Sequence, residues 1–269
     1  MSTKGIFTAL SGAVAQSQRL DTIANNIANS NTTGFKKDNQ VFKEYLTAVE
    51  KPPAVIQVPR VPASIESFYD MQGTDRGYVD ANGTYTSHEQ GSLKATGSPL
   101  DLALQGDGFF EVLTPSGPQF TRAGTFRRDV EGRLVTKEGY PVLKEGYGQP
   151  AEGRLITISS PNITVSQRGE IYEGGEALGK LSMVTMANKE ALQKRGQSLF
   201  ALKPGAQVPV RPANEALVEQ GFIELSNVNV VKEMTDMISA TRAFESTQKA
   251  IQAFDQMDQK LVNDVPRLN

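Results

Sequence analysis

Apolar residues repeat at helical spacing along residues 228–262, a stretch that contains neither glycine nor proline. Steps of three, four and seven residues place them on one face of an α-helix. Asn227 is a candidate N-cap and Glu233 lies in the first turn, where the helix dipole favours an anion. One helix of this length cannot bury its stripe alone, so the pattern predicts a packing partner. The stripe consists of Val230, Met234, Met237, Phe244, Ile251, Phe254 and Leu261.

A second helical pattern lies at the opposite end of the chain, over residues 4–30. Its positions alternate by four and three residues, as in the seam of a coiled coil: Ile6, Leu10, Ala13, Ser17, Leu20, Ala24 and Ile27. Two interpretations remain open, namely a terminal coiled coil and two amphipathic helices in an ordinary core. The small seam residues favour close packing among many helices. Turn-forming residues at 29–34 end the helix.

The pattern changes between these helices. Residues 35–49 predict a shorter second helix or an extended arm, and the prolines within 51–60 predict a stiff linker. From about residue 77, short β-prone runs alternate with glycine-containing turns, which predicts an all-β domain of antiparallel hairpins. The runs are 100–104, 109–113, 120–127, 133–136, 155–158, 163–166, 171–172, 181–186 and 199–202, with one helical turn within 188–195 and a return path at 207–212.

The predicted fold class is therefore α+β, with long N- and C-terminal helices forming a coiled-coil-like pair around an inserted all-β domain. We divide the chain into an N-terminal helical part of the core domain (1–50), an extended linker (51–76), the β-domain (77–205), a return linker (206–225) and the C-terminal helix (226–269). A catalytic domain rarely needs a long helix from each terminus. A polymerising subunit does, because such helices can line a shared axis.

Composition narrows the function classes. The 269 residues carry a formal net charge of −2, which gives no reason to expect nucleic acid or an anionic membrane as partner. The absence of cysteine excludes disulfides and thiolate metal sites. The first twenty residues contain no uninterrupted apolar run, so we expect no Sec signal, and no stretch is apolar enough to span a bilayer.

Candidate chemistry is sparse, and we expect no catalytic residue, cofactor or metal. His88 is the single histidine, which excludes multi-imidazole sites, and we expect it to be an exposed strand residue. The stretch 174–180 imitates a phosphate loop, but Leu181 occupies the hydroxyl position, so a hairpin turn is favoured. Gly106 and Gly108 frame Asp107 in a structural turn that we expect to need positive φ.

Two sequence stretches resemble the signatures of bacterial flagellar rod, hook and hook-associated proteins. Residues 20–36, LDTIANNIANSNTTGFK, are similar to the N-terminal signature, and residues 224–231 with 234–238 to the C-terminal one. Residues 96–110, 120–126 and 132–136 resemble the β-domain of rod and hook members. The resemblance implies that Ala24, Asn25, Asn26 and Asn29 take part in packing between subunits. A plain helix C-cap at 31–34 is the alternative.

This resemblance implies a structural subunit of the basal-body rod, the axial drive shaft for motility, polymerising through its terminal helices. The expected partners are copies of itself, neighbouring proximal- and distal-rod subunits and the flagellar type III export apparatus. The expected location is the periplasm-spanning rod. Residues 139–143 and 234–238 resemble the proximal-rod type of this family more than the distal-rod type. A carbohydrate- or peptide-binding β-domain with helical oligomerisation ends, or a hydrolase with an unusual site, are the rival classes.

Overall fold

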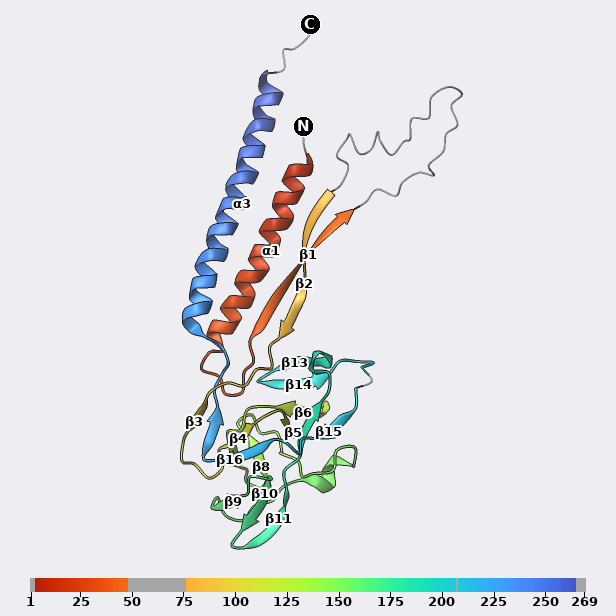
Figure 1. Ribbon diagram of the computed structural model, residues 1–269, viewed down its shortest axis with the longest axis vertical. Coiled ribbons are helices and arrows are strands. Elements are labelled where there is room, and N and C mark those ends of the chain that lie inside the picture. The colour runs from red at the N-terminus through yellow and green to blue at the C-terminus, as the bar shows by residue number, and fades with distance from the viewer. Residues whose placement is uncertain (1–2, 48–75, 207, 265–269) are drawn as a thin grey trace, which may run out of the picture. The chain divides into compact units, whose positions relative to one another are not determined.

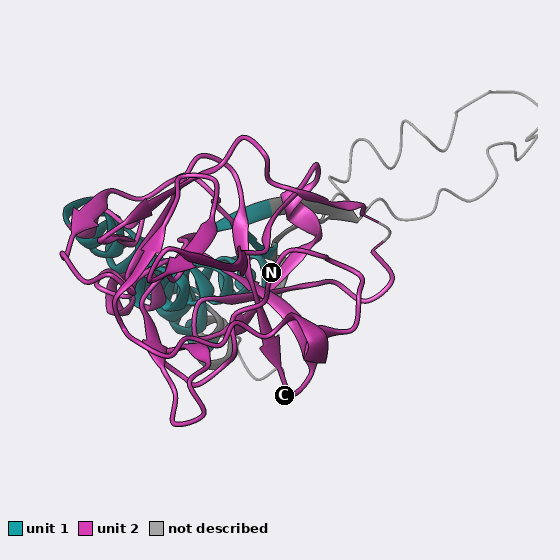
Figure 2. Cartoon of the chain, turned by 90° about the horizontal axis from the view of Figure 1, so that it is seen from below, with its two compact units in different colours: residues 1–24, 39–85, 231–269 teal, residues 25–38, 86–230 magenta. Residues whose placement is uncertain are grey.

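The computed structural model describes residues 3–47, 76–206 and 208–264. The fold is mixed α+β, with helix α1 (Thr3–Ala28), helix α3 (Val230–Asp264) and a β-rich middle (Figure 1). The chain divides into two compact units (Figure 2). The first unit comprises residues 1–24, 39–85 and 231–269, and the second comprises 25–38 and 86–230.

In the first unit, α1 and α3 run antiparallel. A Cβ on Gly5 would lie 2.9 Å from Cζ of Phe254, and one on Gly12 would lie 3.9 Å from Cγ2 of Thr247. The missing side chain at Gly5 is therefore what admits the Phe254 ring. Both predicted helices are present, with ends within two residues of the predicted ones.

A two-stranded sheet of β1 (Asp38–Thr47) and β2 (Arg76–Thr86) also contributes to the first unit. In the stretch 35–49, predicted as a short helix or an extended arm, the described residues 38–47 thus form a strand. Gln40 of β1 donates from Nε2 to Oε1 of Gln18 on α1 at 3.4 Å. The predicted linker at 51–60 lies outside the described residues.

The second unit is built from antiparallel sheets. Its six-stranded sheet has the order β13-β14-β6-β5-β12-β15, and a three-stranded sheet has the order β11-β10-β9. The pairs β16-β4, β17-β3 and β7-β8 complete it. The strands are β3 (Leu93–Ala95), β4 (Leu102–Gln105), β5 (Phe109–Thr114), β6 (Gly117–Thr121), β7 (Phe126–Arg128), β8 (Leu134–Thr136), β9 (Ile163–Val165), β10 (Glu170–Glu173), β11 (Glu176–Lys180), β12 (Met183–Met186), β13 (Leu192–Gly196), β14 (Leu199–Leu202), β15 (Val210–Pro212), β16 (Leu217–Gln220) and β17 (Phe222–Glu224).

Hairpins that close through short turns match the predictions. Strand β7 pairs with β8 across residues 129–132, and β9 pairs with β10 across Arg168 and Gly169. The phosphate-loop mimic is a hairpin turn, since Gly174 and Gly175 have φ of +60° and +96° between β10 and β11. The implied hairpin of β4 with β5 is wrong. Strand β4 pairs instead with β16, and β5 pairs with β6 and β12.

The core of the second unit lies on both faces of β5. Phe110 and Val112 belong to a large apolar cluster, whereas Phe109 belongs to a smaller one with Phe120 and Phe200. Alternation along the strand sends neighbouring side chains to opposite faces, so both clusters meet at β5. Predicted strand 155–158 forms only isolated bridges. Three further strands, β15 to β17, lie where a return linker was expected.

Candidate assembly site: helix faces and an ionic junction

Helix α3 carries apolar residues on two sides. Its fully buried residue is Ala240, while Val231, Met234 and Ile238 are 75%, 51% and 56% exposed. The exposed three are spaced by three and four residues and so share one face. At ~100° per residue this face is roughly opposite Ala240. A helix packs against its own chain with a single apolar stripe, so the second apolar face is available for a partner.

Helix α1 repeats this arrangement. Ala13 and Ile23 are buried, whereas Phe7, Leu10 and Val14 are about half exposed, at 54%, 49% and 51%. The exposed residues again follow a three–four spacing. Each terminal helix therefore presents a continuous apolar strip that its own chain leaves uncovered in the described residues. We call these strips the outer face of α1 (Phe7, Leu10 and Val14) and the outer face of α3 (Val231, Met234 and Ile238).

The predicted assembly residues are distributed over both sides of the helices. On α1, Ala13 and Asn26 are buried, Ile6, Leu20 and Ile27 are partly buried, and Leu10, Ala24 and Asn25 are exposed; Asn29, just beyond the helix, is partly buried. Toward the C-terminus, Met234 is exposed, and Asn227, Val230, Met237, Phe244, Ile251 and Phe254 are partly buried. Leu261 belongs to α3, but its side chain lies outside the description. Phe7, Val14, Val231 and Ile238 were not in the predicted set, although their spacing was visible in the sequence.

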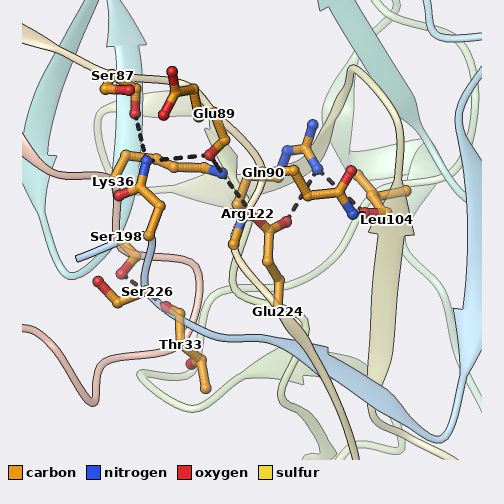
Figure 3. Close-up of polar contacts among 12 residues, drawn as sticks. Thr33, Lys36, Ser87, Glu89, Gln90, Leu104, Arg122, Ser198, Glu224 and Ser226 are labelled. Carbon is orange, nitrogen blue, oxygen red and sulfur yellow. Dashed lines mark hydrogen bonds and ion pairs between the residues drawn. The ribbon is translucent and has the colours of Figure 1, made fainter. Parts of the chain in front are cut away.

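The second unit contains a buried ionic junction around Glu224, at the end of β17 (Figure 3). Nζ of Lys36 lies 2.5 Å from Oε1 of Glu224, and Nη1 of Arg122 lies 3.0 Å from Oε2. The backbone N–H of Gly91 also donates to Oε1 at 2.9 Å. All three ionic side chains are at most 3% exposed. One carboxylate thus holds two cations out of water.

Backbone carbonyls accept further hydrogen bonds from the two cations of the junction, whereas Nε of Arg122 has no partner among the described residues. Lys36 donates to the carbonyl of Glu89 at 2.5 Å, and Arg122 donates to those of Leu104 and Gly106 at 3.3 and 2.6 Å. Burial lowers the pKa of Lys36, and the attraction of Glu224 acts against that shift. A buried charge is tolerated only when it is paired and hydrogen-bonded in this way.

Two glycines allow the segments to approach closely enough for these contacts. Gly34 has φ of +67°, and a Cβ there would lie 2.3 Å from the backbone N of Ala123. A Cβ on Gly91 would lie 2.0 Å from the carbonyl oxygen of Leu225. A side chain at Gly34 would push its segment away from the backbone of Arg122, and one at Gly91 would push its segment away from Leu225, the neighbour of Glu224.

Two asparagines connect the signature segments beside the junction. The Asn227 side chain accepts from the N–H of Lys37 at 2.7 Å and donates to the carbonyl of Ser87 at 3.0 Å. The Asn26 amide exchanges two bonds with the backbone of Asp38, at 2.8 and 3.0 Å. Asn227 thereby links the C-terminal signature segment to the segment that follows the N-terminal signature, and Asn26 links α1 to the start of β1.

His88 differs from its prediction. It follows β2 instead of lying in a strand, and it is partly buried against Phe109 and Phe200, with ring centroids 5.7 and 5.5 Å away. Burial, assisted by nearby cations, the first of which is Lys189, lowers its pKa to about 4. Its Nδ1 has no partner among the described residues. The histidine is therefore a neutral packing residue at neutral pH.

Positive φ was predicted for the turn at 106–108, and this holds for Gly106 but not for Gly108. Gly106 has φ of +95°, as expected. Gly108 has no positive φ; instead, a Cβ there would lie 3.0 Å from Cβ of Ala213 and 3.4 Å from Cβ of Ala216. Lack of space, not backbone conformation, constrains the second glycine.

A second buried ion pair was not foreseen. Arg154 donates through both terminal nitrogens to the Glu111 carboxylate, at 3.0 Å for Nη1, and Ser182 Oγ donates to the same carboxylate at 2.5 Å. Residue spacing gives no signal for it, since Glu111 and Arg154 are 43 positions apart. The group is fully paired and lies inside the β-rich unit, which is typical of a structural ion pair.

The described residues contain no group of three His, Asp or Glu side chains placed to hold a metal. None of the helices in the described part of the chain has an apolar stretch that could cross a bilayer. The charged groups of the junction are paired with one another, and the exposed strips on the helices are apolar. Paired internal charges and exposed apolar helix strips are features of a structural protein.

Comparison with known proteins specifies the family. Residues 6–36 match the flagella basal body rod protein family, residues 103–173 the flagellar hook protein FlgE/F/G D1 domain and residues 219–264 the flagellar basal body rod FlgEFG protein C-terminal family. The flagellar basal-body rod protein FlgG of Bacillus subtilis (strain 168) is 34% identical over 97% of this chain and 98% of its own length. FlgF of Rhizobium meliloti (strain 1021) is 35% identical over 90% and 89%, and FlgF of Caulobacter vibrioides is 31% identical over 98% of both. The chain belongs to the FlgF/FlgG family of flagellar basal-body rod proteins and is a structural protein of the flagellum.

Proposed function

We propose that the chain builds the rod by packing the outer faces of α1 and α3 against the same helices of neighbouring subunits. The observation that carries this proposal is the exposure of six large apolar side chains at helical spacing, three on each terminal helix. Single exposed apolar residues are ordinary, whereas contiguous strips mark interaction surfaces. Burial of the strips on assembly would stabilise the shaft that transmits torque.

The helix pair itself is the repeating element of this proposal. Antiparallel contact of α1 and α3 at Gly5 and Phe254 supports a coiled-coil-like pair, as does the alternation of seam residues by three and four. Residues 1–50 and 226–269 would then form the rod core domain, with the β-domain at 77–205 inserted between them. The predicted assembly residues on the inner side of the helices hold the pair together, and those on the outer faces contact neighbours.

We assign the chain to the proximal-rod type, FlgF, with the distal-rod type, FlgG, as the alternative. Support for FlgF comes from residues 139–143 and 234–238, whereas relatives of both names match at similar identity. Expression in a strain lacking FlgF and in one lacking FlgG separates the two. Restored swimming only in the strain lacking FlgG would reverse the assignment.

The assignment carries further expectations about partners and location. We expect export through the flagellar type III apparatus without a cleaved Sec signal, residence in the periplasm-spanning rod and contact with proximal- and distal-rod neighbours. The subunit has no enzymatic role in this proposal, which is supported by its membership of a family of structural rod proteins. Secretion of the subunit in a strain with an inactive export apparatus would contradict the export route.

An experiment on the outer face of α3 tests the central proposal. Ile238→Asp places a charge on the strip, and its neighbour Ser239→Asp places the same charge on an exposed position beside the strip. Because Ile238 is 56% exposed, the first change should leave the free subunit folded while preventing assembly. Circular dichroism of the purified subunit, blotting of exported protein and rod isolation provide the readouts. Normal rods with Ile238→Asp would sink the proposal.

A further inference from the structure

A groove of about 600 Å³ opens on the β-rich unit, apart from the ionic junction. It lies where β6 and β14 separate, since these strands pair only at Thr121 with Leu199 and at Phe120 with Phe200. Beyond those pairs, β6 continues through Pro118, which has no N–H to donate to a ladder. The groove is therefore a consequence of the sequence of β6, and none of its lining residues belongs to the terminal helices.

One wall of the groove is aromatic. Tyr147 is 42% exposed, and its ring is backed by Phe120 with centroids 6.1 Å apart and planes at 34°. Tyr140 also lines the groove, and its hydroxyl donates to Oε1 of Gln197 at 3.3 Å. A supported, half-exposed ring with polar groups beside it offers a flat apolar surface to a ligand that is polar at its edges.

The floor of the groove contains an unusual amide. Gln119 is 7% exposed, and its Oε1 is buried without any hydrogen-bond partner among the described residues. A buried amide without a partner costs free energy, and native proteins seldom retain one without a reason. Because Oε1 is buried, a ligand in the groove reaches it only after the Gln119 side chain rotates, and a hydrogen bond to that ligand would then supply the missing partner.

The rim adds a hairpin turn and a free charge. Gln197 and Ser198 have φ of +51° and +56° and form the two-residue turn from β13 to β14, as a tight hairpin requires. Arg195 also lines the groove and has no ion-pair partner among the described residues. None of the lining residues is Asp or Glu, so the groove is cationic and lacks the carboxylate pair that glycoside hydrolysis requires.

From this combination we propose that the groove binds an oligosaccharide that carries carboxylate groups. Sugar rings stack their C–H faces on aromatic rings, their hydroxyls exchange hydrogen bonds with planar amides, and a carboxylate pairs with a guanidinium. An extended peptide fits less well, because Pro115 and Pro118 remove two backbone donors from the edge that an added strand would use. The site binds its ligand and performs no bond cleavage.

Titration of the full-length subunit with three probes tests the proposal, observed through side-chain amide resonances. The probes are a galacturonic acid hexamer, an N-acetylglucosamine tetramer and a proline-containing peptide. We expect saturable binding of the hexamer, weaker binding of the neutral tetramer and none of the peptide. Absence of saturable hexamer binding, tighter binding of the tetramer, or binding of the peptide alone would each overturn the assignment.

Variants locate the binding in the groove. Tyr147→Ala and Gln119→Met should each weaken hexamer binding by ~10-fold or more. Gln119→Met should at the same time leave thermal stability equal or higher, because it removes an unsatisfied amide from a buried position. Arg195→Ala should lose the preference for the acidic probe, whereas Arg211→Ala, at an exposed position on β15 at the other edge of the sheet, should keep it. Unchanged binding in both Tyr147→Ala and Gln119→Met would place the hexamer elsewhere and refute the site.

Discussion

The two units of the chain bury their side chains to very different degrees. In the helical unit, the described buried residues are Ala13, Ala15, Ile23, Glu233 and Ala240, all small except for two. The β-rich unit encloses two apolar clusters and two buried ionic groups. Apolar burial is the main favourable term in folding, so the β-rich unit has a hydrophobic core of its own. The helical unit leaves much of its apolar surface exposed, and our proposal is that other subunits cover it.

The largest expected contrast is in the local opening of the two units. In dilute free subunit, amide exchange along α1 and α3 should be at least ~100-fold faster than in β5 and β12, about 3 kcal/mol in opening free energy. The reason is the small amount of apolar surface that the helices bury without neighbours. Limited proteolysis should likewise cut both helices and spare residues 86–230. Equal protection of helices and strands in a verified monomer would remove the contrast.

The ionic junction should be the most sensitive point within the β-rich unit. Glu224→Gln leaves Lys36 and Arg122 buried without a counter-charge and should cost ~3–5 kcal/mol of unfolding free energy. Lys36→Met should cost less, because Arg122 still neutralises the carboxylate. Denaturant unfolding of the free subunit measures both values.

An exposed glutamate supplies the control for that comparison. Glu131 is 61% exposed beside Arg133, so Glu131→Gln should leave the unfolding midpoint nearly unchanged. A larger loss from Lys36→Met than from Glu224→Gln would show that the junction is not organised around its single carboxylate.

His88 provides a pH-dependent measure of the β-rich core. Its pKa is about 4 in the folded chain against an ordinary 6.5, so between these values the unfolded chain binds a proton that the folded chain does not. The contribution of the buried neutral imidazole to the free energy of unfolding is therefore fully present above pH 6.5 and is lost as the pH falls toward 4. His88→Phe removes this loss, and we expect the stability difference between variant and wild type to change by on the order of 2 kcal/mol between pH 7 and 4.

Unfolding curves of both proteins over this pH range provide the measurement. Carboxylates also titrate near pH 4, and only the difference between the two proteins isolates the histidine. Lys36, Arg122, Lys189 and Lys194 are the cations that act on His88, and they keep their charge over the range. Parallel curves for the two proteins would mean that His88 is not desolvated as its position between Phe109 and Phe200 indicates.

The features that sequence predicted are those that depend on nearby residues. Periodicity located both helices, and turn residues located the β7–β8 and β9–β10 hairpins, because each signal lies within one element or one short loop. The pairing of β4 with β16 joins Leu102 to Gln220, and no local pattern specifies such a partner. The wrong prediction for His88 has the same origin, since the rings that cover it belong to β5 and β14.

The residues of the candidate site also divide into those that local spacing predicts and those that only the fold brings together. The residues predicted from spacing include the inner sides of α1 and α3 and one member of each outer face, Leu10 and Met234. The other members of the outer faces were missed because a single stripe was assumed to exhaust the apolar residues. The junction joins Lys36 and Glu224 across 188 positions, and Arg122 and Glu224 across 102. In the sequence, none of these three residues differs from an ordinary charged residue on the surface. Only the fold shows that they share one buried point.

The smallest expected effect separates two glycines of one turn. Gly106→Ala should cost about 1 kcal/mol, because φ of +95° is unfavourable for alanine. Gly108→Ala should cost a similar ~1 kcal/mol for another reason, since its Cβ would lie 3.0 Å from that of Ala213. Ala213→Gly removes the opposing Cβ, so it should reduce the cost of Gly108→Ala and leave the cost of Gly106→Ala unchanged. Double-mutant cycles by denaturant unfolding measure this coupling, expected at ~0.5 kcal/mol or more. Equal coupling of both glycines to Ala213 would mean that space, and not backbone conformation, constrains the whole turn.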